Sequence, residues 1–211
     1  ASSFRKQTAE QLLKEVRFDA IRGNISEIKT LASLCGTQEK NSGNMAVSDT
    51  MDVEKITDKS DHCGKITGID GSGRGVDADN ADTVTEENLA QHISNAKMLS
   101  KKLQTIVAIT GAIDLVTDGS SCYVIRNGNP QMEHVTGAGC QLSGILTAFL
   151  AANPENKLQA AAAAVCMMGY AGELAAEKSG QSSSGTYRVS LMDAVSCMDL
   201  SLIHISEPTR P

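Results

Sequence analysis

Apolar residues return every three or four positions in several parts of the chain, which is the spacing that places them on one face of a helix. The pattern predicts helices over residues 8–17, 26–34, 85–103, 141–152, 157–177 and 193–198. Ser26 is placed to cap the second of these helices, and Gly36 to end it. A run of alanines within 157–177 permits close packing against a neighbouring helix.

Short stretches with the composition of β-strands lie between these helices, over residues 18–21, 105–110, 114–117, 122–126 and 131–135. Residues 105–110 form a continuous β-branched run, so we expect a central strand of a parallel sheet, buried on both faces. The turn residues 118–121 predict a hairpin between the third and fourth stretches. The alternation of helices and strands indicates a layered α/β fold.

The turn that precedes the helix at 141 carries the most chemical information in the chain. Two glycines flank an alanine in Gly137-Ala138-Gly139, and Cys140 follows. A tight turn of small residues at a helix N-terminus directs unpaired amides into one concavity, where the helix dipole favours an anion. The alternative is a plain tight turn in which Cys140 is a small buried hydrophobe.

Residues 37–80 lose this periodicity and are rich in Gly, Ser, Asp, Asn and Lys. We interpret them as a long, mobile surface insertion. Within it, residues 71–75 either grip a phosphate or, since no strand and helix flank them, form a flexible loop. His62 and Cys63 are two adjacent potential metal ligands without a second pair nearby, which makes a metal site a poor prediction.

Composition narrows the range of partners and compartments. The chain has 211 residues, enough for one substantial core, with a net charge of −6 and few aromatic residues, so we expect no nucleic-acid partner. No apolar run approaches the roughly 20 residues that span a bilayer, so we expect no membrane segment. The six cysteines are scattered without a Cys-x-x-Cys pair, which is typical of reduced thiols in the cytoplasm.

Several separated motifs resemble the hydroxyethylthiazole kinases of thiamine salvage, which belong to the ribokinase-like superfamily. The matching stretches are residues 20–28, 105–114, 127–130, 136–140 and 171–177. The resemblance implies a layered α/β/α fold with a mostly parallel central sheet. It also implies a kinase that transfers the γ-phosphate of ATP to the hydroxyethyl group of 4-methyl-5-(2-hydroxyethyl)thiazole.

The resemblance assigns roles to the residues of the glycine-rich turn. The amides of Gly137, Ala138, Gly139 and Cys140 are suited to stabilise charge on the transferred phosphoryl group. Gly137 is implied to lie against the thiazole, where a side chain would block close approach. Cys140 stands where sugar kinases of the superfamily have an aspartate base; either its thiolate accepts the proton of the substrate hydroxyl, or it only packs beside the reacting oxygen.

Further site residues follow from the same resemblance. Arg22 and Thr110 align with the two ATP-contacting residues of the family. Asn24 and Glu27 match an Asn-x-x-Glu element whose acid orders Mg²⁺, usually through water. The alternative for Glu27 is an acid in the first turn of a helix that complements the helix dipole.

The resemblance also predicts how the chain is organised. Residues 1–200 are expected to be the C-terminal portion of a single kinase domain that lacks its N-terminal strands and helices. Residues 201–211 match nothing in the family and resemble translated sequencing-adaptor sequence, so we expect a non-native tail. The full-length family typically forms homotrimers.

Other interpretations remain open at this point. A hydroxymethylpyrimidine kinase also has cysteine in the turn, whereas an ATP-dependent dehydratase that repairs hydrated nicotinamide cofactors would need aspartate there. An inactive fragment is the non-catalytic alternative. Asp114 and Asp118 resemble a catalytic pair, but their hairpin positions favour solvated turn residues, and His134 is expected to pack within a strand.

Overall fold

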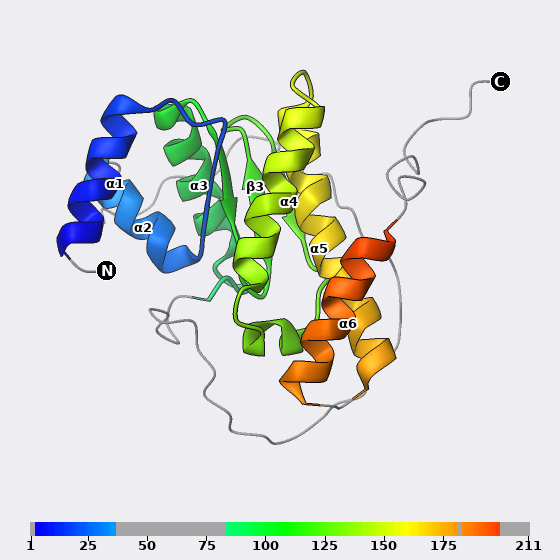
Figure 1. The fold of residues 1–211 in the computed structure, drawn as a ribbon. Coiled ribbons are helices and arrows are strands. Elements are labelled where there is room, and N and C mark those ends of the chain that lie inside the picture. Colours follow the sequence, from blue (N-terminus) through cyan, green and yellow to red (C-terminus); the bar gives the residue numbers. More distant parts are fainter. Residues whose placement is uncertain (1–2, 37–82, 181–182, 199–211) are drawn as a thin grey trace.

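The computed structural model describes residues 3–36, 83–180 and 183–198 (Figure 1). The predictions for the insertion at 37–80 and for the tail at 201–211 therefore lie outside the described residues.

A four-stranded sheet lies at the centre of the fold, in the order β1 (Ala20–Gly23), β2 (Ile106–Ile109), β3 (Asp114–Thr117) and β4 (Cys122–Ile125). β1 and β2 pair in parallel, while β2 with β3 and β3 with β4 pair antiparallel. The expectation of a mostly parallel sheet is therefore wrong for the described strands. The short connections after β2 and β3 permit only antiparallel neighbours, because a parallel return needs a crossover of a dozen residues or more.

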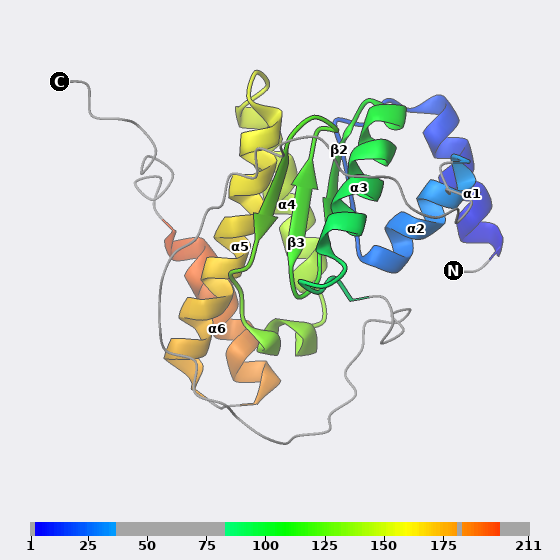
Figure 2. The same ribbon diagram turned by 180° about the vertical axis from the view of Figure 1, so that it is seen from behind.

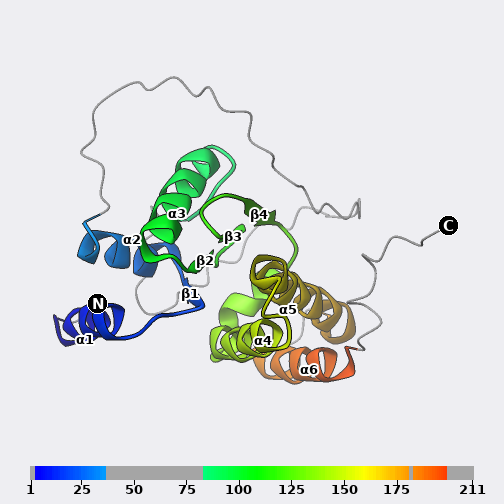
Figure 3. The same ribbon diagram turned by 90° about the horizontal axis from the view of Figure 1, so that it is seen from above.

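Helices cover both faces of this sheet, which confirms the layered α/β fold (Figure 3). One face is covered by α2 (Ile25–Leu34) and α3 (Leu89–Leu103). The other is covered by α4 (Ala138–Ala152) and α5 (Lys157–Ser179), with α6 (Ser184–Cys197) packed against α5. Alternate strand residues divide between two cores: Val107 packs with α2 and α3, and Ala108 with the helices of the opposite face.

β2 is the strand on which the two layers depend. All four of its residues are buried, as predicted for a central strand covered on both sides. α3 packs against this strand with residues that are also buried and recur at helical spacing: Ile93, Ala96 and Leu99. The sequence pattern thus located both the strand and the helix that packs on it.

The first helix is more exposed than its sequence pattern predicts. α1 spans Ser3–Glu15 and lies beside α2 at the edge of the fold, yet none of its residues is buried (Figure 2). Leu12, one of its apolar residues, is 46% exposed. α1 therefore has amphipathic spacing, but no element among the described residues buries its apolar side chains.

The segment expected to be a fifth strand is a short 3-10 helix, η2 (Pro130–His134). Pro130 has a fixed φ and no N–H, so it suits the first position of a helical turn and not a central strand. Asn129 caps this turn by accepting a hydrogen bond from the N–H of Gln131 at 3.0 Å. His134 consequently ends the turn in an exposed position instead of packing within a strand.

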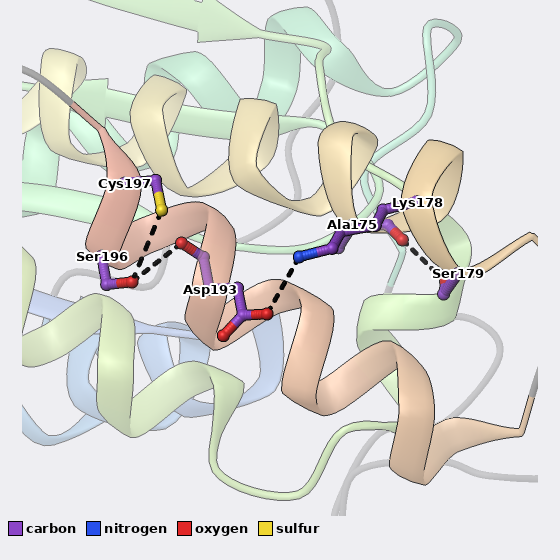
Figure 4. Close-up of polar contacts among 6 residues, drawn as sticks. All are labelled: Ala175, Lys178, Ser179, Asp193, Ser196 and Cys197. Carbon is purple, nitrogen blue, oxygen red and sulfur yellow. Dashed lines mark hydrogen bonds and ion pairs between the residues drawn. The ribbon is translucent and has the colours of Figure 1, made fainter.

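α6 begins at Ser184 and is longer than the short helix predicted at 193–198, and its Tyr187 and Leu191 are buried at helical spacing. It is held to α5 by polar contacts (Figure 4). Lys178 pairs with Asp193 at 3.0 Å, and the Tyr187 hydroxyl donates to the carbonyl of Gly172 at 2.9 Å. Ser179 donates back to the Ala175 carbonyl within α5.

α5 corrects the expectation that no apolar run approaches the length of a membrane span. Its 23 residues are long and apolar enough to cross a bilayer, by length and composition only. Of its most apolar window, 61% is buried inside the fold, between α4, α6 and the sheet. A central helix of a layered fold meets the same criterion.

We predict that Gly169→Ala destabilises the fold by about 1–3 kcal/mol. A Cβ at Gly169 of α5 would lie 2.6 Å from Oδ1 of Asn127, whose Nδ2 donates to the Cys166 carbonyl at 2.7 Å. The amide would have to move and lose that hydrogen bond. Urea denaturation measures the change in unfolding free energy.

Gly144→Ala is the matched control for this substitution. Gly144 also lies inside a long helix, but a Cβ there would meet nothing within 4 Å. Alanine should therefore stabilise α4 by roughly 0.5–1 kcal/mol. Equal effects of the two substitutions would contradict the packing described for Asn127.

Candidate functional site

The strand register places three polar residues, Arg22, Thr110 and Asp114, on one face of the sheet, at the edge where β1 and β2 have their carboxyl ends. Arg22 pairs with Ala108, and Ala108 pairs with Val116, so these three share a face. Side chains alternate along a strand, so Thr110 and Asp114, each two positions away from this row, belong to the same face. This is the face that α4 and α5 cover. The carboxyl ends of parallel strands are where α/β sheets bind ligands.

Arg22 reaches from β1 to the first turn of α4. Its Nη1 donates to the carbonyl of Gly139 and, at 3.2 Å, to Oγ of Ser143. A Cβ at Gly139 would lie 2.9 Å from Nη2 of Arg22, so a residue without a side chain is required for this approach. The structure thus brings together a predicted ATP-binding residue and the predicted anion turn, which lie far apart in the sequence.

The glycine-rich turn starts α4 three residues earlier than predicted. Its N-cap, Gly137, has φ +99°, a left-handed conformation that glycine adopts without strain, and a Cβ there would meet nothing within 4 Å. The N–H groups of Ala138 and Gln141 are bonded to the carbonyls of Val135 and Gly137. The N–H groups of Gly139 and Cys140 have no acceptor among the described residues.

Cys140 has an exposed thiol, so the interpretation of this residue as a small buried hydrophobe is wrong. Its side chain is accessible beside two amides without a partner. Nearby, Nε of Arg22 is shielded from solvent and has no acceptor in the described part of the chain. A fixed guanidinium, two unpartnered amides and the positive end of a 15-residue helix together favour an anion.

The expectation that Asp114 is a solvated turn residue is wrong. Asp114 is partly buried at the start of β3 and accepts a hydrogen bond from the N–H of Gly111 at 2.8 Å. Burial raises the pKa of Asp114 to about 6, although that hydrogen bond and the charge of Arg22 oppose the rise. Only the strand register, which follows from long-range pairing, could have placed this carboxylate on the Arg22 face.

Asp118 behaves as expected of a turn residue and forms no pair with Asp114, because the two flank opposite ends of β3. It is exposed in the hairpin between β3 and β4, where its Oδ1 accepts hydrogen bonds from Ser120 and Ser121. Burial alone would raise the pKa of Asp118, but these hydrogen bonds outweigh it and lower the pKa.

Asn24 and Glu27 begin α2, directly after β1. Oδ1 of Asn24 accepts from the N–H of Glu27, and Oε2 of Glu27 accepts from the N–H of Asn24, both at 2.8 Å. This is a capping box, so Asn24 caps the helix and not Ser26 as predicted. The second carboxylate oxygen of Glu27 has no donor within the described ranges, and the residue is exposed.

Thr110 joins the same edge of the sheet, because its N–H donates to the carbonyl of Gly23 at 3.0 Å. The predicted residues from β1, β2, α2 and α4 therefore converge on the carboxyl end of the first two strands. Within the part of the chain that the structure describes, no group of three or more His, Cys, Asp or Glu residues is arranged to hold a metal. Any cation here would depend on few protein ligands.

Comparison with known proteins identifies relatives for most of the chain. A model of the hydroxyethylthiazole kinase family matches residues 45–200. The chain is 40% identical over 200 residues to a hydroxyethylthiazole kinase of Clostridium acetobutylicum, covering 94% of the chain and 60% of the relative. It is 32% identical over 203 residues to that of Clostridium beijerinckii, covering 96% and 60%. The chain thus spans about 60% of the length of these curated relatives.

A solved structure supports the fold. A hydroxyethylthiazole kinase from Pyrococcus horikoshii superposes with a TM-score of 0.65 at 21% sequence identity. The match covers 97% of this chain and 58% of that one. The chain therefore shares its arrangement of elements with a solved protein. A sequence identity of 21% supports a conclusion about the fold only.

We predict that Asp114 makes stability fall as the pH rises. The pKa is raised to about 6 in the folded state from 3.8, so the folded chain holds this proton more tightly. The contribution is present below pH 4 and is lost as the pH rises through 6, on the order of 3 kcal/mol in total. Urea denaturation between pH 4 and pH 7 should show this fall, and Asp114→Asn should remove it.

Asp118→Asn is the control, with the opposite sign. The pKa of Asp118 is lowered in the folded state, so its contribution is present above the ordinary carboxyl pKa and is lost as the pH falls. If Asp114→Asn left the pH dependence of the unfolding free energy unchanged, the partly buried carboxylate described here would be contradicted.

Proposed function

Because the chain belongs to the hydroxyethylthiazole kinase family, we propose that its protein transfers the γ-phosphate of ATP to the hydroxyl of 4-methyl-5-(2-hydroxyethyl)thiazole in thiamine salvage. The observation that carries this proposal is the contact of Arg22 with the first turn of α4. It places a fixed positive charge beside two unpartnered amides, which is the arrangement that a triphosphate needs.

ATP binding in this proposal rests on Arg22, Thr110 and the α4 N-terminus. The buried Nε of Arg22 lacks an acceptor, and the N–H groups of Gly139 and Cys140 lack one as well. Phosphate oxygens supply acceptors for the two amides, and the guanidinium adds its positive charge; charge-assisted hydrogen bonds are about twice as strong as neutral ones. Thr110, at the end of β2, meets the nucleotide from the sheet side.

Phosphoryl transfer is served by the same turn. Negative charge spreads over the transferred group in the transition state, and the unpartnered amides of Gly139 and Cys140 are available to stabilise it, whereas the N–H of Ala138 is already bonded to the Val135 carbonyl. The exposed Cys140, as its thiolate, accepts the proton of the thiazole alcohol, whose oxygen then forms the new bond to phosphorus while ADP leaves. Gly137 leaves open space for the thiazole, because no atom lies within 4 Å of where its Cβ would be.

Glu27 and Asn24 fit a magnesium site of the kind that relies on one carboxylate. One oxygen of Glu27 closes the capping box, while the other has no donor in the described chain and is exposed. Mg²⁺ prefers oxygen ligands and keeps several of its waters, so a single carboxylate with the nearby Asn24 amide is sufficient. The ion, when bound, neutralises charge on the nucleotide phosphates.

We place this protein in the cytoplasm, with ATP and the thiazole alcohol as its small-molecule partners. A homotrimer of the full-length protein completes the proposal. The net charge of −6 and the scarcity of aromatic residues support the absence of a nucleic-acid partner. The burial of α5 inside the fold supports the absence of a membrane partner.

ADP release with different acceptors tests the proposal. The chain is assayed alone and as a chimera in which it replaces the matching part of the Clostridium acetobutylicum relative. Thiazole-dependent ADP release supports the proposal. Turnover with hydroxymethylpyrimidine or with hydrated NADH in its place would assign a sibling activity, and no turnover in either form would indicate an inactive fragment.

We predict that Glu27→Gln lowers thiazole-dependent ADP release by about ten- to hundredfold. Glutamine keeps an acceptor for the Asn24 N–H, so the capping box and the fold should persist. Glu155→Gln, an exposed change in the α4–α5 turn, is the control and should leave the rate unchanged. An unaltered rate in Glu27→Gln would remove the metal role from this residue.

A further inference from the structure

Ser143 is a side chain to which neither the family motif nor the strand pattern draws attention, yet it touches the central arginine. It lies on α4 one turn after Gly139, and its Oγ donates to the Gly139 carbonyl at 3.1 Å. The same Oγ is 3.2 Å from Nη1 of Arg22. Its single proton serves the carbonyl, so its lone pairs are free to accept from the guanidinium.

These contacts form a closed triangle. Nη1 of Arg22 donates to the Gly139 carbonyl and to Ser143, and Ser143 donates to that carbonyl. Nε of Arg22 has no acceptor among the described residues, so the head of the side chain is fixed mainly through Nη1. Without the Ser143 hydroxyl, the Gly139 carbonyl alone would have to orient the Arg22 guanidinium.

We propose that Ser143 is a positioning residue that holds the Arg22 guanidinium against α4, so that the arginine and the helix N-terminus meet a nucleotide phosphate as one preformed anion site. This inference rests on the proposed function, since it names how that site is assembled. An arginine side chain loses considerable rotamer freedom when it is fixed, and a site that orders it beforehand spares this cost on binding.

The alternative is a purely local role. A serine hydroxyl inside a helix often bonds to the carbonyl four residues earlier, without any wider function. Thr147 does this one turn later on the same exposed side of α4, where its Oγ1 donates to the Ser143 carbonyl at 2.8 Å. No hydrogen bond joins Thr147 to Arg22 in the described chain, so Thr147 is a matched control.

The experiment compares the affinities of four variants for two probes by calorimetric titration. The variants are Ser143→Ala, Ser143→Thr, Thr147→Ala and Arg22→Gln, and the probes are ATP with Mg²⁺ and adenosine. We expect Ser143→Ala to weaken ATP binding about fivefold or more, as the loss of one hydrogen bond to a charged group implies, with adenosine binding unchanged. Ser143→Thr keeps the hydroxyl and should bind ATP within about twofold of the unsubstituted chain, as should Thr147→Ala.

The outcomes separate this inference from the proposed function. If Arg22→Gln loses ATP affinity but Ser143→Ala retains it, the positioning role is overturned and the function stands. If Ser143→Ala weakens both probes equally, or Thr147→Ala matches it, the hydroxyl acts only on the helix and the inference fails. If the unsubstituted chain does not bind ATP, the proposed function falls, and the inference falls with it.

Discussion

The contact between Arg22 and the first turn of α4 is the interaction on which the account of this site depends. It joins the end of β1 to a helix 117 positions further along the chain. The guanidinium donates to a carbonyl of that turn and so places positive charge where the helix dipole is already positive. Asp114, a partly buried carboxyl group on the same face of the sheet, is near enough for the charge of Arg22 to oppose the rise in its pKa.

This arrangement needs small residues at specific positions. Ala108 stands beside Arg22 in the sheet register and leaves the face open for a long side chain. Gly139 lets the guanidinium approach, whereas Gly137 meets a different demand, since its backbone is left-handed and the space around it is open. The two glycines of this motif are therefore required for different reasons: Gly139 for the close contact with Arg22, and Gly137 for its left-handed backbone.

Local patterns predicted the parts of the fold that local forces determine. The buried run of β2, the β3–β4 hairpin and the long helices follow from composition and spacing, and the glycine-rich turn before α4 was found in the same way. The expectation of a mostly parallel sheet came from the resemblance, whereas the short connections after β2 and β3 determine antiparallel pairing. The exposure of α1 depends on contacts distant in sequence, which the pattern cannot show. Asp114 was interpreted as a solvated turn residue because its burial depends on contacts distant in sequence; Arg22, on the same face of the sheet, is 92 positions away in the numbering (114 − 22).

A crystal structure of the chain with Mg²⁺ and a non-hydrolysable ATP analogue tests the central claim most directly. The account predicts that the terminal phosphates lie against the Arg22 guanidinium and accept hydrogen bonds from the N–H groups of Gly139 and Cys140. Phosphates bound elsewhere, with those two amides turned away from the nucleotide, would contradict it.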